Sequence, residues 1–171
     1  MKLSHMPSTS LQELNLSQPK TLKDLQAWKH YKDCLKSSMK HEYVPKYNYT
    51  DKTANGLTRA VIDYINFSGG FAERISTTGR IIDNSTTVTN VIGQTKSYGG
   101  KKYIPGTGTK GSADISATIH GKSVKIEVKI GKDRQSEDQK QYQARTLASG
   151  GIYIIAKTFE DFIKELPFNL K

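Results

Sequence analysis

Two acidic side chains and a lysine stand at a spacing that could hold a metal ion. Asp114 and Glu127 lie on either side of the dipeptide His120-Gly121, and Lys129 follows Glu127 by two residues. Mg²⁺ is usually held by one or two protein carboxylates together with waters and substrate phosphate. A lysine beside such an ion could position a water molecule or a phosphate oxygen. These residue types therefore suit metal-dependent hydrolysis of a phosphate ester.

The sequence around the acids predicts a β-hairpin that would bring them together. Polar and apolar residues alternate on both sides of His120-Gly121, which suits a two-residue turn between antiparallel strands. With that turn, Ile115 faces Ile126 on one side of the sheet and Asp114 faces Glu127 on the other. Two carboxylates directly opposite each other would lie ~4.5–5.5 Å apart and would repel. A divalent cation between them would relieve that repulsion.

An ordinary sheet surface is the alternative interpretation of the same hairpin. Lys125 and Lys129 are both diagonal to Asp114 and could simply neutralise a solvated face, since charged residues alternate along any half-exposed strand. The spacing alone leaves both interpretations open.

The order Asp114, then Glu127-Val128-Lys129, resembles the signature of the PD-(D/E)XK nuclease superfamily, an Asp at the start of one strand and Glu-x-Lys on the next. More narrowly, four stretches resemble the VRR-Nuc family found in phage and bacterial stand-alone nucleases: Gly111-Ser112-Ala113-Asp114, Ile126-Glu127-Val128-Lys129, Ser136-Glu137-Asp138-Gln139, and Gly150-Gly151 ahead of an apolar strand. The similarity spans residues 57–162.

The resemblance implies a role for each residue of the motif. Asp114, Glu127 and the Val128 carbonyl would bind Mg²⁺ or Mn²⁺, and Lys129 would position the water or the scissile phosphate. Gln139 would reach back toward this site as a further catalytic residue. Its spacing from Ser136 also has the S-x-x-Q form of a helix-capping box, so a structural role for Gln139 is equally open.

A third acidic ligand is not evident. Many nucleases of the superfamily carry a glutamate in the first core helix, where this chain has Asn55 or Thr58, with Asp63 further along. We do not count Asp63 as a ligand. The sequence therefore predicts a two-carboxylate site that takes its remaining ligands from backbone, water and DNA.

The charge of the chain predicts a polyanionic partner. The formal net charge is +10 and the pI is about 9.6, and an excess of Lys and Arg favours nucleic acid by releasing counterions from phosphates. The segment 97–111 is expected to be a glycine-rich surface loop that approaches phosphates closely. The candidate DNA contacts are Arg74, Lys101, Lys102, Lys110, Ser112, Tyr142 and Gln143.

Other site chemistries find little support. Cys34 is the single cysteine, so an internal disulfide and a thiolate metal cluster are excluded, and the four histidines lack zinc-ligand spacing. No long apolar run or signal-peptide core occurs, so we expect no membrane partner and a cytoplasmic protein of a bacterial or phage-infected cell.

The predicted fold is α/β, with a mixed central β-sheet flanked by helices, and agrees with the restriction-endonuclease-like core that the resemblance implies. Residues 1–50 form a basic N-terminal arm with one helix at about 22–39, and residues 51–171 form the nuclease domain. The further expected elements are a helix ending at 68–70, strands at 71–82 and 88–94, the hairpin, a helix at 136–149, a strand at 151–156 and a helix at 158–167.

The function expected from the resemblance is a structure-selective DNA endonuclease. Stand-alone relatives resemble Holliday-junction resolvases, which implies branched or double-stranded DNA, a homodimer, and a role in recombination, repair or replication. One rival is a non-catalytic DNA-binding module on the same fold. Another is an interaction factor that docks through the helix at 22–39.

Overall fold

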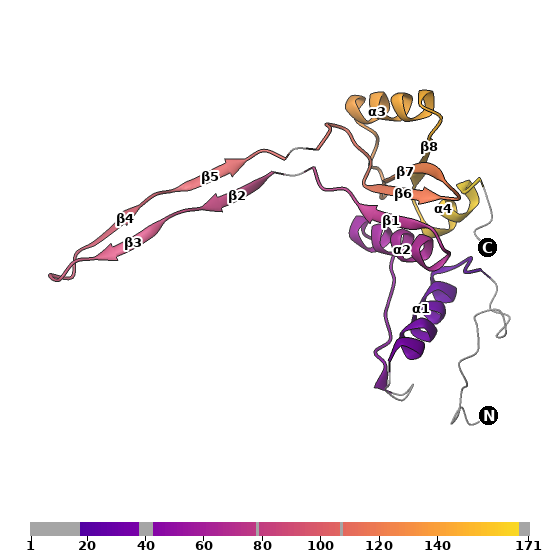
Figure 1. The fold of residues 1–171 in the computed structure, drawn as a ribbon, viewed down its shortest axis with the longest axis horizontal. Helices are drawn as coiled ribbons and strands as arrows, with labels where there is room; N and C mark the ends of the chain where they lie inside the picture. Colours follow the sequence, from indigo (N-terminus) through magenta and orange to yellow (C-terminus); the bar gives the residue numbers. More distant parts are fainter. Residues whose placement is uncertain (1–17, 38–42, 78, 107, 168–171) are drawn as a thin grey trace.

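The computed structural model describes residues 18–37, 43–77, 79–106 and 108–167. A four-stranded mixed sheet forms its centre, in the order β1-β6-β7-β8 (Figure 1). The pairs β1–β6 and β6–β7 are antiparallel, and β7–β8 is parallel. The bounds are Phe71–Arg74 for β1, Ile115–Ile119 for β6, Lys122–Val128 for β7 and Ile152–Ala156 for β8.

Helices cover both faces of this sheet. Helices α2 (Ala54–Phe67) and α4 (Phe159–Glu165) lie on one face, and α3 (Glu137–Ala148) lies on the other (Figure 1). Thr53, Ser136 and Thr158 cap the three N-termini with side-chain oxygens. The expected α/β class with a mixed, helix-flanked sheet is confirmed.

The central hairpin has the register that its alternation predicts. Ile115 pairs with Ile126, and Ile119 pairs with Lys122 at the turn. His120 has φ 48° and Gly121 has φ 75°. Positive φ at both central residues matches a type I′ turn, whose twist suits two-residue hairpins.

The two faces of the hairpin differ sharply in polarity. Ile115, Val124 and Ile126 are fully buried against α2 and α4, where Tyr64 packs edge-on against both Phe159 and Phe162. The opposite face carries Ser116, Lys125 and Glu127 and lies toward α3. None of the residues of α3 is buried. The apolar core therefore occupies one side of the sheet, and a polar layer occupies the other.

The N-terminal helix α1 (Leu22–Lys36) packs against α2. Thr21 and Asp24 form its capping box, and Trp28 meets Phe67 edge-on. The Lys32 ammonium donates to the Phe67 carbonyl at 2.8 Å. The helix is shorter than expected, and positions 38 and 39 of the predicted span lie outside the described residues.

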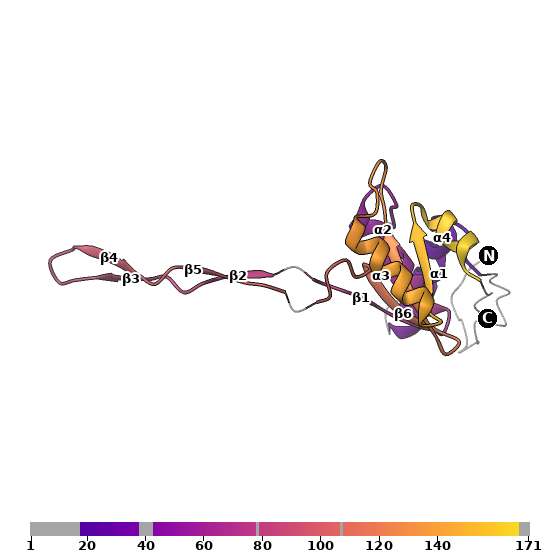
Figure 2. The same cartoon turned by 90° about the horizontal axis from the view of Figure 1, so that it is seen from above.

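The segment between β1 and β6 differs most from its prediction. Residues 80–104 form a long two-stranded antiparallel hairpin, which we call the β-ribbon, extending away from the sheet (Figures 1 and 2). Its strands are β2 (Arg80–Asp83), β3 (Thr86–Thr89), β4 (Thr95–Tyr98) and β5 (Lys101–Ile104).

Three expectations for this segment are therefore wrong. The strand predicted over 71–82 ends at Arg74 and restarts at Arg80, and the strand predicted over 88–94 stops at Thr89. Much of the predicted loop 97–111 is strand. The turn lies at Asn90–Gln94 instead, because the Asn90 side chain accepts hydrogen bonds from the amides of Ile92 and Gln94.

The burial of Leu25 indicates that α1 is part of the hydrophobic core. Leu25 and Tyr49 both precede residue 51, yet they lie in the same buried cluster as α2 and the sheet. The division into an N-terminal arm and a nuclease domain therefore remains a prediction.

Leu25→Ala should lower the free energy of unfolding by about 3 kcal/mol, as removal of a fully buried leucine side chain does. Leu35→Ala is the matched control on the same helix, because Leu35 is 49% exposed, and should change it by less than about 0.5 kcal/mol. Urea denaturation measures both. Equal, small changes would show that α1 is an appendage to an independently stable domain.

Candidate active site

The candidate acids lie at one end of the central sheet. Ile115, the first residue of β6, pairs with Ile126 near the end of β7. Arg74, the last residue of β1, pairs with Ile115 from the other side. Glu127 also lies beside Ile155 near the end of the parallel strand β8. The strand ends that carry Asp114 and Glu127 therefore converge at this edge, which is also where the β-ribbon leaves the sheet (Figure 1).

Glu127 is a buried carboxylate with three donors around it. The residue is 1% exposed. Its Oε1 accepts a hydrogen bond from Gln139 Nε2 and lies 3.1 Å from the Lys129 ammonium. Its Oε2 accepts from the Tyr153 hydroxyl at 3.4 Å. These donors come from three different elements and hold the carboxylate in one orientation.

Gln139 fulfils both of its predicted geometries. Its Oε1 accepts from the Ser136 amide at 2.9 Å, and the Ser136 hydroxyl accepts from the Gln139 amide, which completes the capping box. Its Nε2 donates to Glu127. The same side chain thus caps α3 and links the first turn of that helix to the buried acid.

Asp114 is near Glu127 but is not its partner in the β-ladder. The ladder begins at Ile115, one residue later than expected. The Asp114 carboxylate accepts from the Val128 amide at 2.9 Å, and its carbonyl accepts from the Ile75 amide at 2.8 Å. The expected direct opposition of the acids in the ladder is therefore wrong. The Asp114 carboxylate bonds the Val128 amide, while its carbonyl continues the pairing with the β1 side at Ile75.

The lysines do not neutralise Asp114 as the alternative interpretation required. Lys125 donates to the Ser116 hydroxyl at 2.6 Å. Lys129 lies between Glu127 and Asp133, with its ammonium 3.3 Å from the Asp133 carboxylate. Within the described ranges, no ion pair includes Asp114.

Burial and charge shift the pKa values of these groups. Burial raises the pKa of Glu127, and the nearby charge of Asp114 raises it further, more than the bond from Lys129 lowers it. For Lys129, burial acts to lower the pKa, but the hydrogen bonds and charges of Glu127 and Asp133 outweigh it and the pKa rises. Burial and the charge of Glu127 raise the pKa of Tyr153, so its hydroxyl stays a donor.

Two neighbouring carboxylates suit a hard divalent cation. The charge of Asp114 disfavours the ionised form of Glu127, and a cation between the two acids would reverse that effect. Mg²⁺ needs only one or two such ligands, with waters completing its shell. No group of three or more His, Cys, Asp or Glu that could hold a metal occurs among the residues described, so the fit rests on two acids.

The first core helix supplies no further acid. Asn55 is exposed and Thr58 is buried within α2. Asp63 accepts a 2.5 Å hydrogen bond from the Tyr49 hydroxyl, which holds it to the segment before the helix.

The candidate DNA contacts fall into two groups. Arg74, Lys110, Ser112, Tyr142 and Gln143 lie around the end of the sheet that carries the acids. Lys110 pairs with Asp138 on α3, and Tyr142 packs edge-on against Tyr153. Lys101 and Lys102 lie on β5, in the half of the β-ribbon nearer the central sheet, and the structure does not bring them to the acids (Figure 1).

Sequence reasoning missed Asp133 and Tyr153. Asp133 follows Lys129 by four residues and bonds its ammonium. Tyr153 lies beside Lys125 in the parallel register, which puts it on the same face as Glu127. The alternation Ile152, Tyr153, Ile154 places Tyr153 on the opposite face from the two isoleucines. It identifies that face as the one with Glu127 only if β8 is taken to pair in parallel with β7.

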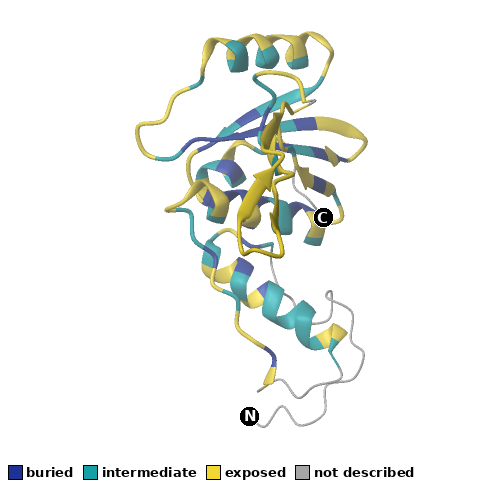
Figure 3. Ribbon diagram, turned by 90° about the vertical axis from the view of Figure 1, so that its left-hand side faces the viewer, coloured by how far each residue is buried: buried dark blue, intermediate teal, exposed yellow. Residues whose placement is uncertain are grey.

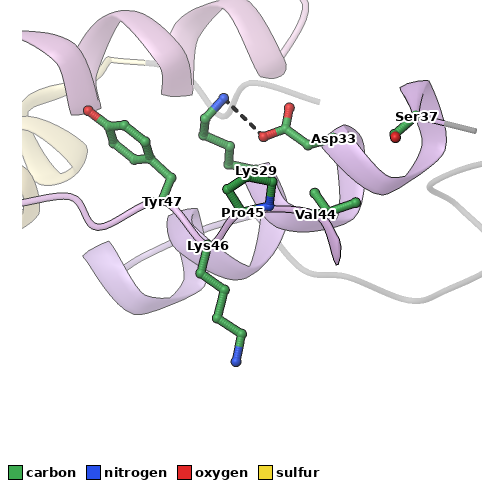
Figure 4. Close-up of a pocket in the computed structure, with 7 residues that line it drawn as sticks. All are labelled: Lys29, Asp33, Ser37, Val44, Pro45, Lys46 and Tyr47. Carbon is green, nitrogen blue, oxygen red and sulfur yellow. Dashed lines mark ion pairs between the residues drawn. The ribbon is translucent and has the colours of Figure 1, made fainter. Parts of the chain in front are cut away.

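Two surface pockets lie beside α3 and α1, and neither is lined by Asp114 or Glu127. One pocket lies between α3 and the polar face of the sheet, and Lys125 and Arg145 are among its lining residues. The other lies on the α1 side of the molecule and is lined by Lys29, Asp33, Ser37, Val44, Pro45, Lys46 and Tyr47 (Figure 4). Lys29 and Asp33 form an ion pair at 3.2 Å there, and the site acids do not line it.

Comparison with known proteins gives no relative from which a role could be transferred. The chain matches no protein-family model, no curated protein and no solved structure. In the part of the chain that the structure covers, no helix is long and apolar enough to cross a membrane.

The buried pair of Glu127 and Lys129 predicts strong coupling between the two residues. In EDTA, Lys129→Met should lower the free energy of unfolding by about 3 kcal/mol, because it leaves Glu127 buried without its cation. The double variant Glu127→Gln/Lys129→Met should recover most of that loss. Denaturant unfolding of all four proteins measures the coupling. Additive effects would show that the pair is not coupled in solution.

The raised pKa of Glu127 predicts a pH dependence of metal-free stability. Because the folded pKa lies above the ordinary value of 4.5, ionising Glu127 destabilises the fold. The parent should therefore lose stability relative to Glu127→Gln as the pH rises from about 4.5 through the folded pKa. Paired urea titrations in EDTA test this. A stability difference that does not change with pH would contradict the shift.

Proposed function

We propose that this chain is a metal-dependent DNA endonuclease with a restriction-endonuclease-like core, of the VRR-Nuc type that its motif resembles. The observation that carries the proposal is the buried Glu127, fixed by Lys129 and Gln139 next to Asp114 at one end of the sheet. A buried carboxylate with a raised pKa and a second acid beside it is typical of functional sites.

Asp114, Glu127 and the Val128 carbonyl would hold Mg²⁺ or Mn²⁺. When bound, such an ion lowers the pKa of a water molecule and stabilises the charge that develops on the phosphate. The Val128 amide donates to Asp114, so the peptide next to the proposed carbonyl ligand also positions the other acid.

The remaining residues of the site act on position and charge. Gln139 and Tyr153 fix the two oxygens of Glu127 separately, so the carboxylate is oriented before any ligand binds. The Lys129 ammonium is held beside Glu127 and Asp133, from where it can donate to an attacking water or a phosphate oxygen. Its raised pKa keeps it charged for that role.

The net charge of +10 supports a nucleic-acid substrate. Following the resemblance, we propose cleavage of branched or double-stranded DNA, in the manner of Holliday-junction resolvases, by a homodimer. The setting would be the cytoplasm of a bacterial or phage-infected cell, in DNA recombination, repair or replication.

A non-catalytic DNA-binding module on the same fold is the second candidate. It is favoured by the complete set of donors around Glu127, since a carboxylate satisfied by Lys129, Gln139 and Tyr153 is also a stable structural feature. The two candidates differ in whether the acids bind metal.

Cleavage by conservative variants tests the endonuclease. Glu127→Gln and Asp114→Asn should each lower cleavage of supercoiled, branched and duplex DNA with Mg²⁺ or Mn²⁺ by more than about 100-fold, because even outer partners of a metal site contribute 10–100-fold. Glu160→Gln is the matched control, because Glu160 is an exposed residue in the first turn of α4.

Two results would contradict the proposal. Cleavage by Glu127→Gln at the rate of the parent would show that this acid is not needed. Calorimetry that finds no Mn²⁺ binding dependent on both Asp114 and Glu127, together with intact DNA binding, would assign the chain to the non-catalytic class.

A further inference from the structure

The β-ribbon is a long projection without a core of its own. The inner and outer strand pairs share one register, from Arg80 opposite Ile104 to Thr89 opposite Thr95. Each side of the ribbon has ten residues, 80–89 and 95–104, which span about 30 Å when extended. All four strands are largely exposed, as the ribbon in Figure 3 shows. Because isolated two-stranded hairpins are marginally stable in water, a projection of this length indicates a partner.

One face of each ribbon segment satisfies its own polar groups. In the outer segment, the hydroxyl pairs Thr87–Ser97 and Thr89–Thr95 lie 3.3 and 3.2 Å apart across the strands. In the inner segment, Asp83 and Lys101 form an ion pair at 3.8 Å.

The other face of each segment carries cations without acidic partners. Alternation along the strands places Arg80 and Lys102 on this face in the inner segment, and Lys96 on it in the outer segment. No described acid pairs with any of the three. Between the cations lie Ile82, Ile104, Val88 and Tyr98.

The charge of the ribbon points to a polyanion. Residues 80–104 contain four basic side chains and one acidic side chain, and the acid is already paired with Lys101. The apolar residues Val88 and Tyr98 are more than half exposed on the cationic face, and Val91 and Ile92 are exposed at the tip. Cations interleaved with exposed apolar and aromatic groups suit a surface that meets both phosphates and bases.

The chain that leads to the ribbon leaves the central sheet beside the candidate active site. The amide of Ile75, the residue after β1, donates to the carbonyl of Asp114, so this segment is held next to the acid five residues before the ribbon begins. The returning chain is held against α3, because Gly111 has φ 75° and a Cβ there would collide with the backbone of Asp138. A polyanion that lies along the ribbon and continues toward the central sheet would reach the end of the sheet that carries the acids.

We propose that the β-ribbon lies in the major groove of duplex DNA, with Arg80, Lys96 and Lys102 on the flanking phosphates and with Val88 and Tyr98 toward the base edges. The major groove is about 12 Å wide and admits a two-stranded ribbon. This inference rests on the proposed nuclease function and specifies its substrate: a double helix that continues beyond the cleavage site for about the length of the ribbon.

The test is binding of a 30-base-pair duplex in EDTA, measured by fluorescence anisotropy over a series of salt concentrations. Arg80→Ala/Lys96→Ala/Lys102→Ala should weaken binding at least about tenfold and reduce the salt slope by about 2–3, because three phosphate contacts are lost. The charge-matched control is Lys23→Ala/Lys122→Ala/Lys164→Ala, three exposed lysines on α1, at the start of β7 and on α4. It should change affinity less than about threefold, since it removes no groove contact.

Three results would overturn the proposal. An affinity unchanged in the ribbon variant, or lowered equally in both triple variants, would show that the ribbon has no specific part in binding. If the ribbon variant lost as much affinity for single-stranded DNA of the same length as for the duplex, binding in the major groove would be excluded. Conversion of a dimer to a monomer by the ribbon variant, seen by light scattering with duplex affinity unchanged, would assign the ribbon to a second copy of the chain.

The same measurements separate this inference from the proposed function. Ribbon-dependent duplex binding by a parent protein that cleaves no DNA with either metal would support the ribbon and refute the nuclease. Cleavage that depends on Glu127 in a protein whose duplex binding does not need the ribbon would do the reverse. Circular dichroism and thermal unfolding of both triple variants verify that they are folded.

Discussion

The buried charge of Glu127 is the constraint on which the rest of the structure depends. A carboxylate that is 1% exposed needs donors, and it receives them from Lys129 just after β7, from Gln139 in α3 and from Tyr153 in β8. These bonds tie the first turn of α3 to β7, and they tie Tyr153 of the parallel neighbour β8 to the same carboxylate. One ionisable group thus links three elements of the fold.

Stability and chemistry are divided between the two faces of the sheet. Phe159, Phe162 and the isoleucines of the central hairpin fill the face toward α2 and α4. The face toward α3 is polar, and α3 contributes no buried residue to it. The contacts that hold this helix are the bond from Gln139 to Glu127, the ion pair of Lys110 with Asp138, and the packing of Tyr142 against Tyr153. Substitutions in the polar layer can therefore alter the site while the core stays packed.

The two faces of the β-ribbon also differ from each other, as the two faces of the central sheet do. The ribbon contributes no described residue to the buried cluster, yet the chain that leads to it leaves the central sheet at Ile75, which bonds Asp114. Its polar groups are satisfied on one face and its cations are unpaired on the other. A projection built in this way adds reach and charge at the end of the sheet where the acids are, and it leaves the packing that positions them unchanged.

Local pattern was enough to predict the hairpin, its register from Ile115 onward and the N-terminal caps of α1, α3 and α4, because alternation beside His120-Gly121 and the Ser136–Gln139 spacing act over a few residues. Tertiary structure decided the rest. The bend of Asp114 toward Val128 and the placement of Tyr153 depend on pairing between distant segments. The strands of the β-ribbon lack a buried face, so no apolar alternation marks them, and the glycines at 99 and 100 indicated a loop. Apolar alternation marks a strand only where one face of the strand is buried, so it cannot predict strands that are exposed on both faces.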